Sequence, residues 1–114
     1  MKIDRFEEII AWQKAKELTL LIYPIMRNNR DYSFRDQIQR ASISIMNNIA
    51  EGFERRTNKD MKNFLFIAKG SAGETRSMID LGYSMKYFSK SEYDLVYGLT
   101  MDISKLLSGF IKTL

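Results

Sequence analysis

Helix-breaking residues are scarce in this chain, which has one proline and six glycines in 114 residues. Between these residues, apolar side chains recur every three or four positions, the spacing that places them on one face of an α-helix. A helical period with so few interruptions favours long helices over the many short strands of a β-domain. The sequence therefore predicts an all-α protein.

Start and stop signals divide the chain into four predicted helices, at about residues 5–23, 34–55, 57–88 and from 89 to near the C-terminus. Pro24 lacks an amide hydrogen, so the first helix should end or kink there. Each later helix begins after a hydroxyl side chain that an acidic residue follows within one turn, which favours N-capping: Ser33, Thr57, and Ser89 or Ser91. The short connections fold each helix back on the one before, which predicts an up-and-down antiparallel four-helix bundle in a single domain, residues 1–114.

The second predicted helix is apolar around an unusually large part of its circumference. Its apolar and small residues sweep roughly 200°, against the ~100° of an ordinary core-facing helix: Ile38, Ala41, Ser42, Ile43, Ile45, Met46, Ile49, Ala50 and Phe53. Either this helix lies deep among its neighbours or part of it packs against another subunit, and we expect self-association. The other two long helices have narrower stripes that should face the core: Met61, Phe64, Leu65, Ala68, Ala72, Ile79 and Tyr83, then Leu95, Leu99, Ile103, Leu106, Leu107, Phe110 and Leu114.

Polar residues follow the remaining face of the second helix and one line of the third. They can serve as a binding site, but we favour a hydrogen-bonded network that fixes helix register within the bundle or between subunits: Gln37, Arg40, Ser44, Asn48, Glu51, Ser71 and Glu74. Because an unpaired buried charge is costly, the arginines here should pair with acids: Arg40 and Arg55 with Glu51, Glu54 or Glu74. Gly70 and Gly73 each cost about 1 kcal/mol relative to alanine, which predicts a close backbone approach where the second helix crosses.

The net charge of +4 is concentrated in the middle of the chain. Residues 27–76 hold ten basic and six acidic side chains, whereas the segments on either side are balanced. Three of the basic residues recur every seven positions on the third helix, and three more lie at the connection between the second and third helices: Lys62, Lys69 and Arg76, then Arg55, Arg56 and Lys59. Such spacing can neutralise successive phosphates of a nucleic acid. The alternative is an ordinary solvated helix face.

Three segments resemble the four-helix-bundle proteins named for open reading frames in 23S ribosomal RNA intervening sequences. They are residues 12–15 (WQKA), residues 37–52 with their QIQRASISI and NIAEG runs, and residues 68–74 (AKGSAGE). The resemblance implies an up-and-down bundle, an intracellular bacterial protein and pentameric rings. It also implies kinship with the accessory protein of diversity-generating retroelements, a basic pentamer that binds nucleic acid and a reverse transcriptase. For the family as a whole it implies no established biochemical activity.

The chain contains no histidine and no cysteine. This composition removes the commonest general base, the usual nucleophile–base pairs and most transition-metal sites. Glu51 and Glu74 could face each other as a carboxylate pair, but a structural network is the better interpretation. We therefore predict no enzyme, no metal and no cofactor.

The location of the protein follows from what its sequence lacks. The N-terminal residues have mixed charge and lead into an amphipathic segment, not into the apolar core of a signal peptide. The longest apolar stretch, residues 18–26, is far shorter than the ~20 residues that span a bilayer. We expect a cytoplasmic protein without a membrane role.

An aromatic group surrounds the predicted turn between the third and fourth helices: Tyr83, Tyr87, Phe88, Tyr93 and Tyr97. Tyrosine tolerates half-buried sites, so these residues should close the end of the bundle or fill an interface. A small-molecule pocket is the alternative.

These observations favour a non-enzymatic, oligomeric protein that binds nucleic acid, in particular structured RNA, through its basic residues. The partners expected are therefore further copies of the chain, as a pentamer, and RNA or DNA. The rival hypothesis is a protein-interaction or scaffold module whose basic surface is incidental.

Overall fold

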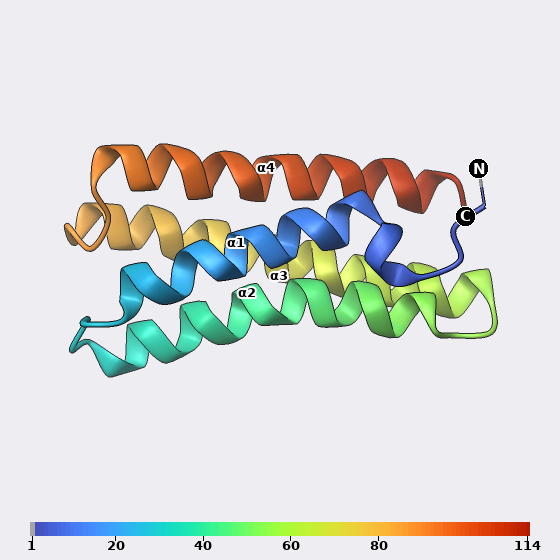
Figure 1. The fold of residues 1–114 in the computed structure, drawn as a ribbon, viewed down its shortest axis with the longest axis horizontal. Coiled ribbons are helices and arrows are strands. Elements are labelled where there is room, and N and C mark those ends of the chain that lie inside the picture. The colour runs from blue at the N-terminus through green and yellow to red at the C-terminus, as the bar shows by residue number, and fades with distance from the viewer. Residues whose placement is uncertain (1) are drawn as a thin grey trace.

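The computed structural model describes residues 2–114, which form four long helices. Figure 1 shows these helices running alternately up and down the length of the molecule. A short 3-10 turn, η1 (Phe6–Glu8), precedes α1 (Ile10–Met26), α2 (Tyr32–Phe53), α3 (Asn58–Ser84) and α4 (Lys90–Lys112). α1 packs against α2 and α4, and α3 packs against the same two helices, so α1 and α3 lie diagonally opposite. The bundle measures 42 × 22 × 19 Å. The predicted fold, an up-and-down four-helix bundle, is confirmed.

Side-chain caps begin three of the helices. The Thr57 hydroxyl accepts from the Asp60 amide at 3.1 Å, and Ser89 forms a reciprocal capping box with Glu92, so both predicted caps are confirmed. The prediction of Ser33 is wrong, because α2 begins at Tyr32 and Asp31 caps it.

The Asp31 carboxylate serves two elements at once. Its Oδ1 accepts from the Phe34 amide at 3.2 Å, and its Oδ2 accepts from the Tyr87 hydroxyl at 2.7 Å. The second contact comes from the α3–α4 connection, 56 positions away. A distant residue therefore fixes where α2 begins, and local spacing could not show it.

The ends of α1 and α3 differ from the prediction. α1 continues through Pro24 to Met26. Pro24 has no amide hydrogen to donate to the Leu20 carbonyl, but Leu20 lies on an exposed side of the helix, where water can supply the missing hydrogen bond. α3 ends at Ser84, four residues early. Lys86 adopts a left-handed φ of 66°, and the Tyr87 amide returns to the Gly82 carbonyl at 2.8 Å, which closes the helix as in a Schellman motif.

The bundle itself covers most of the apolar arc of α2. Five residues of the arc are buried, because α2 packs against α1, α3 and η1 together: Ile38, Ala41, Ser42, Ile45 and Ile49. Met46 and Phe53 are partly buried against the core, and Ile43 and Ala50 are half-buried. Of the two alternatives for this helix, the structure therefore supports a position deep among its neighbours, and the arc no longer argues for self-association.

The core-facing sides of α3 and α4 are rotated slightly from the predicted stripes. Leu95 is 51% exposed and Tyr83 is 37% exposed, contrary to expectation. Val96 and Thr100 take the place of Leu95 in the interior. Helical spacing places Leu95 at the margin of the apolar stripe, whereas packing against two neighbouring helices decides which margin is covered.

Close approach between α2 and α3 occurs at Gly52, not at the predicted glycines of α3. A Cβ at Gly52 would lie 2.8 Å from the Phe64 Cβ, whereas one at Gly70 would meet nothing within 4 Å. At Gly73 the nearest atom is a flexible Arg76 nitrogen at 4.0 Å. The prediction for Gly70 and Gly73 is therefore wrong within the protomer, because both lie on the outward side of α3.

Candidate nucleic-acid interface

The three basic residues spaced seven apart lie along one line of α3, because seven residues make almost two helical turns. Arg76 shows which side of α3 this line occupies, since its Nη1 donates to the Ser104 hydroxyl of α4 at 3.4 Å. Lys69 is exposed, while Lys62 and Arg76 are half-buried. The line therefore follows the side of α3 that borders α4.

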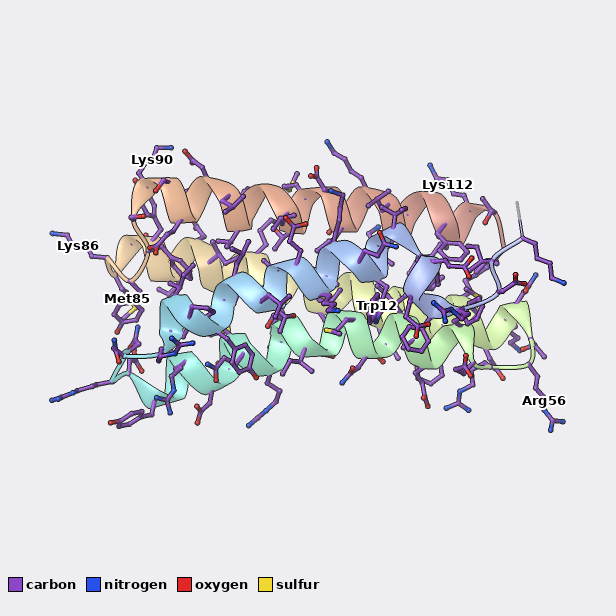
Figure 2. All side chains as sticks on the ribbon, viewed as in Figure 1. Trp12, Arg56, Met85, Lys86, Lys90 and Lys112 are labelled. Atoms are coloured by element: carbon purple, nitrogen blue, oxygen red, sulfur yellow. The ribbon has the colours of Figure 1, made fainter. Side chains whose placement is uncertain are left out.

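The three basic residues of the α2–α3 connection have different surroundings. Arg55 forms an ion pair with Glu51, with Nη2 and Oε1 2.8 Å apart, and its guanidinium lies 4.6 Å from the centre of the Phe64 ring. Arg56 and Lys59 are exposed and have no ion pair within residues 2–114. Figure 2 shows Arg56 projecting from the end of the bundle. Glu51 therefore offsets the positive charge of Arg55, whereas no acid among the described residues pairs with Arg56 or Lys59.

α4 adds two lysines that the sequence reasoning missed. Lys105 and Lys112 line a shallow hollow of about 430 Å³ together with Arg76, Ser104 and Ser108. The missed signal is their spacing, since they are seven residues apart like the basic residues of α3. We call the combined surface the basic face: Lys62, Lys69, Arg76, Lys105 and Lys112.

The basic face has the chemistry of a phosphate-binding surface. Successive cations along each helix are about 10 Å apart along its axis, and two helices present them side by side. Among the described residues, none of those lining the hollow is acidic. Contacts of cations with phosphates release counterions and carry no sequence information.

The predicted polar network is much smaller in the structure. The Ser44 and Ser71 hydroxyls lie 3.0 Å apart between α2 and α3, and the Asn48 amide donates to the Ser44 carbonyl at 2.8 Å and to its hydroxyl at 2.9 Å. These three residues hold the register of the two helices. The structure does not bring the other four into this cluster: Gln37, Arg40, Glu51 and Glu74.

Charged members of the predicted network face water. Glu51 pairs with Arg55, one of the expected pairings. Arg40 is exposed and has no ion pair in the described part of the chain, so the expectation that an acid neutralises it is not met. An exposed guanidinium is solvated by water and needs no protein partner.

The aromatic group closes the end of the bundle between α3 and α4. The Tyr83 and Tyr93 rings stack with centroids 4.3 Å apart, and Tyr97 follows 5.2 Å from Tyr93. Phe88 is buried, and a Cβ at Gly82 would lie 2.6 Å from its ring. Ring packing of this kind serves structure.

The described residues form neither a membrane-spanning helix nor a cluster of metal ligands. Within residues 2–114, no helix combines the length and apolar character that crossing a bilayer requires. Nor does this part of the chain place three His, Cys, Asp or Glu side chains together as potential metal ligands.

Comparison with known proteins identifies a family and a similar solved structure. A family model described as "23S rRNA-intervening sequence protein" matches residues 7–109. The solved structure has a TM-score of 0.84 and 27% sequence identity, and the similarity covers 90% of this chain and 98% of the other. It is the crystal structure of a protein with unknown function from the S23 ribosomal protein family of Bacteroides thetaiotaomicron VPI-5482. No curated protein matches this chain.

Proposed function

The chain belongs to the 23S rRNA-intervening sequence protein family, and from this premise we propose that it is a non-enzymatic, oligomeric protein of the cytoplasm that binds structured RNA. The basic face of α3 and α4 is the binding surface, extended by Arg56 and Lys59 at the end of the bundle. The observation that carries the proposal is the gathering of three cations, Arg76, Lys105 and Lys112, around a hollow between two adjacent helices without a carboxylate among its described lining residues. Lys62 and Lys69 continue the line of Arg76 along α3 at seven-residue spacing. The resemblance to a basic accessory protein that binds nucleic acid points the same way.

Self-association is supported by a different surface from the one the sequence suggested. Phe66, Ile67 and Leu81 are each about half exposed on α3, at 53%, 51% and 52%. Gly70 lies on the same outward side and leaves its surroundings open. A helix from another copy can approach closely there. A ring of copies, such as the pentamer implied by the resemblance, repeats the basic face and multiplies its affinity for a long polyanion.

The binding proposal is tested with a reversal of charge on the basic face. We expect the wild-type protein to bind a structured RNA hairpin with an affinity that falls steeply with salt. Lys69→Glu with Lys105→Glu should weaken binding at least tenfold at about 50 mM salt and reduce the salt slope by roughly 1.8, about 0.9 per lost phosphate contact. Fluorescence anisotropy across a salt series measures both quantities.

A matched control separates the basic face from net charge. Lys16→Glu with Lys90→Glu changes the charge equally on exposed parts of α1 and α4 that lie outside the basic face. We expect a much smaller effect on affinity. Equal losses in both variants, or no binding of the hairpin by the wild type at about 50 mM salt, would overturn the proposal.

The second candidate function, a protein-interaction module, is favoured by an apolar groove that adjoins the basic face at Lys105. The groove has a volume of about 700 Å³ and lies between the start of α1 and the last turns of α4, where Ile3, Ile10, Leu106 and Phe110 line it. Recovery of a defined protein partner after nuclease treatment, with no retained RNA, favours this candidate over the first.

A further inference from the structure

A furrow follows the seam between α1 and α2, away from the basic face. It consists of three adjoining hollows of about 330, 190 and 320 Å³. The first shares Arg27 and Arg35 with the second, and the second shares Tyr23 and Gln39 with the third. Because neighbouring hollows share lining residues, the three lie next to one another along the seam.

The length of the furrow suits a short segment of an extended polymer. Its α2 wall extends over residues 32–43, which span about 16 Å at the helical rise per residue. Roughly five nucleotides occupy that length at the 3.4 Å spacing of a stacked strand. The furrow is therefore long enough for several nucleotides.

Arginine supplies the charge of the furrow. Four arginines line it, Arg27, Arg30, Arg35 and Arg40, against one acid, Asp36, whose Oδ1 lies 3.5 Å from the Arg35 Nε. In the described part of the chain, the other three arginines have no ion pair. The furrow thus keeps an excess of three positive charges.

The remaining acid of this segment is turned away from the furrow. Both Asp31 carboxylate oxygens are occupied, one by the Phe34 amide and the other by the Tyr87 hydroxyl. Asp31 lines none of the three hollows. The contact that begins α2 therefore keeps Asp31 out of the furrow, so Asp36 is the only carboxylate among the residues that line the three hollows.

Two exposed tyrosines stand among the arginines. Tyr32 is 58% exposed and lines the first hollow, and Tyr23 is 39% exposed and lines the other two. The Arg35 guanidinium already lies 4.8 Å from the centre of the Tyr32 ring. An exposed aromatic ring in a positive groove is a platform on which an unpaired base stacks, and each such contact raises affinity roughly 5- to 150-fold.

The furrow differs from the basic face in the kind of cation it carries. The basic face has four lysines and one arginine, whereas the furrow has only arginines, accompanied by the amides of Asn28 and Gln39. Lysine acts as a point charge toward phosphate, while the planar guanidinium also stacks on bases and donates paired hydrogen bonds to their edges. Amides both donate to and accept from base edges.

We propose that the furrow between α1 and α2 binds unpaired nucleotides of a single-stranded nucleic acid, with bases stacked on Tyr23 and Tyr32 and phosphates held by Arg27, Arg30, Arg35 and Arg40. A duplex is a poor ligand for it, because paired bases cover each other's faces and leave none for the tyrosines. The proposal goes beyond the binding of structured RNA at the basic face and does not depend on it.

The test uses a fluorescein-labelled uridine octamer and the full chain. Tyr23→Leu with Tyr32→Leu keeps apolar bulk but removes both rings, and it should weaken octamer binding at least tenfold with an unchanged salt slope. Arg27→Gln with Arg35→Gln should weaken binding and reduce the slope by about 1.4, as two lost phosphate contacts on a single strand require. Circular dichroism confirms that each variant keeps its helices, since all four side chains line the surface.

Two control variants match these changes outside the furrow. Tyr83→Leu removes a partly exposed ring, and Lys16→Gln with Lys90→Gln removes two exposed charges. Octamer affinity within twofold of wild type in both controls supports the proposal. Unchanged affinity in the tyrosine variant, or competition by a 12-base-pair RNA duplex as strong as by unlabelled octamer, overturns it. The basic face is tested with substitutions at other residues, Lys69 and Lys105, so either site can fail without the other.

Discussion

Tyr87 links the α3–α4 connection to the start of α2 through one hydrogen bond. Its hydroxyl donates to the Asp31 Oδ2 at 2.7 Å, and its ring lies 5.1 Å from that of Phe34. This hydrogen bond to Asp31, together with burial and the negative charge of the carboxylate, raises the pKa of Tyr87 above its usual value of 10.0. The neutral phenol is therefore the form that the folded protein prefers.

The raised pKa predicts a pH dependence of stability. In the unfolded chain Tyr87 loses its proton near pH 10, whereas in the folded protein it does so at higher pH. The contact thus contributes its full stabilisation below pH 10, and the contribution is lost as the pH rises through the folded pKa. We expect Tyr87→Phe to be less stable than wild type at pH 7.

Urea unfolding of both proteins between pH 7 and pH 11 checks this prediction. The difference in the free energy of unfolding should shrink above pH 10. The pKa of Lys90 is also raised, by its hydrogen bond to Asp94 and by the negative charge of the Asp94 carboxylate. This shift occurs in both proteins, so it cancels in the difference between their free energies of unfolding. A constant difference across the pH range would contradict the assignment.

At the scale of elements, the helices pack closely where glycine permits it. Gly52 lets α2 approach α3 against Phe64, and Gly82 makes room for Phe88 below the α3–α4 connection. Gly70 has no such role within the bundle, although it lies in the middle of α3. Glycine therefore permits close packing at positions 52 and 82, whereas at position 70 it makes no room for a neighbour within the protomer.

Alanine substitution should distinguish these positions. Gly52→Ala places a methyl group 2.8 Å from the Phe64 Cβ, and the forced separation of α2 and α3 should cost about 1–3 kcal/mol. Gly70→Ala meets open space and should stabilise the protomer by about 1 kcal/mol through helix propensity. Urea unfolding of dilute protein measures both changes. Equal destabilisation of the two variants would show that the close approach of α2 to α3 does not lie at Gly52.

At the scale of the whole molecule, the surface is divided by chemistry. The basic face lies on α3 and α4, the furrow on α1 and α2, and the exposed apolar residues of α3 lie on its outward side. Figure 2 places Arg56 and Lys112 at one end of the bundle and Lys86 and Lys90 at the other. An assembly through the outward side of α3 can therefore form without covering the furrow.

The outward side of α3 predicts how assembly can be broken. Phe66→Asp with Leu81→Asp introduces charge where a second copy would pack, and it should shift the protein to the mass of a single protomer while its helix content stays the same. Leu20→Asp, at a position 64% exposed on α1, serves as the control and should leave the mass unchanged. Size-exclusion chromatography with light scattering measures the masses. A wild-type protein that is a lone protomer at micromolar concentration would contradict self-association.

Much of the fold could be predicted from residues close to one another in the chain. The helical period, the scarcity of breakers and the caps at Thr57 and Ser89 depend on contacts within about one turn, so sequence alone reveals them. The seven-residue spacing of Lys62, Lys69 and Arg76 is local in the same sense. The resemblance to the 23S rRNA-intervening sequence proteins also came from short runs of residues, and the family match confirms it.

Only the tertiary structure decided which surfaces these elements share. Asp31 replaces Ser33 as the cap of α2 because Tyr87 reaches it from another connection, and Val96 replaces Leu95 in the core because two neighbouring helices cover that side of α4. The tertiary structure likewise places Lys105 and Arg76 around one hollow and forms the furrow between α1 and α2. Both surfaces bring together residues that are distant in sequence. The physical reason is that helix formation is governed by neighbours along the chain, whereas the rotation and pairing of helices are governed by packing between them.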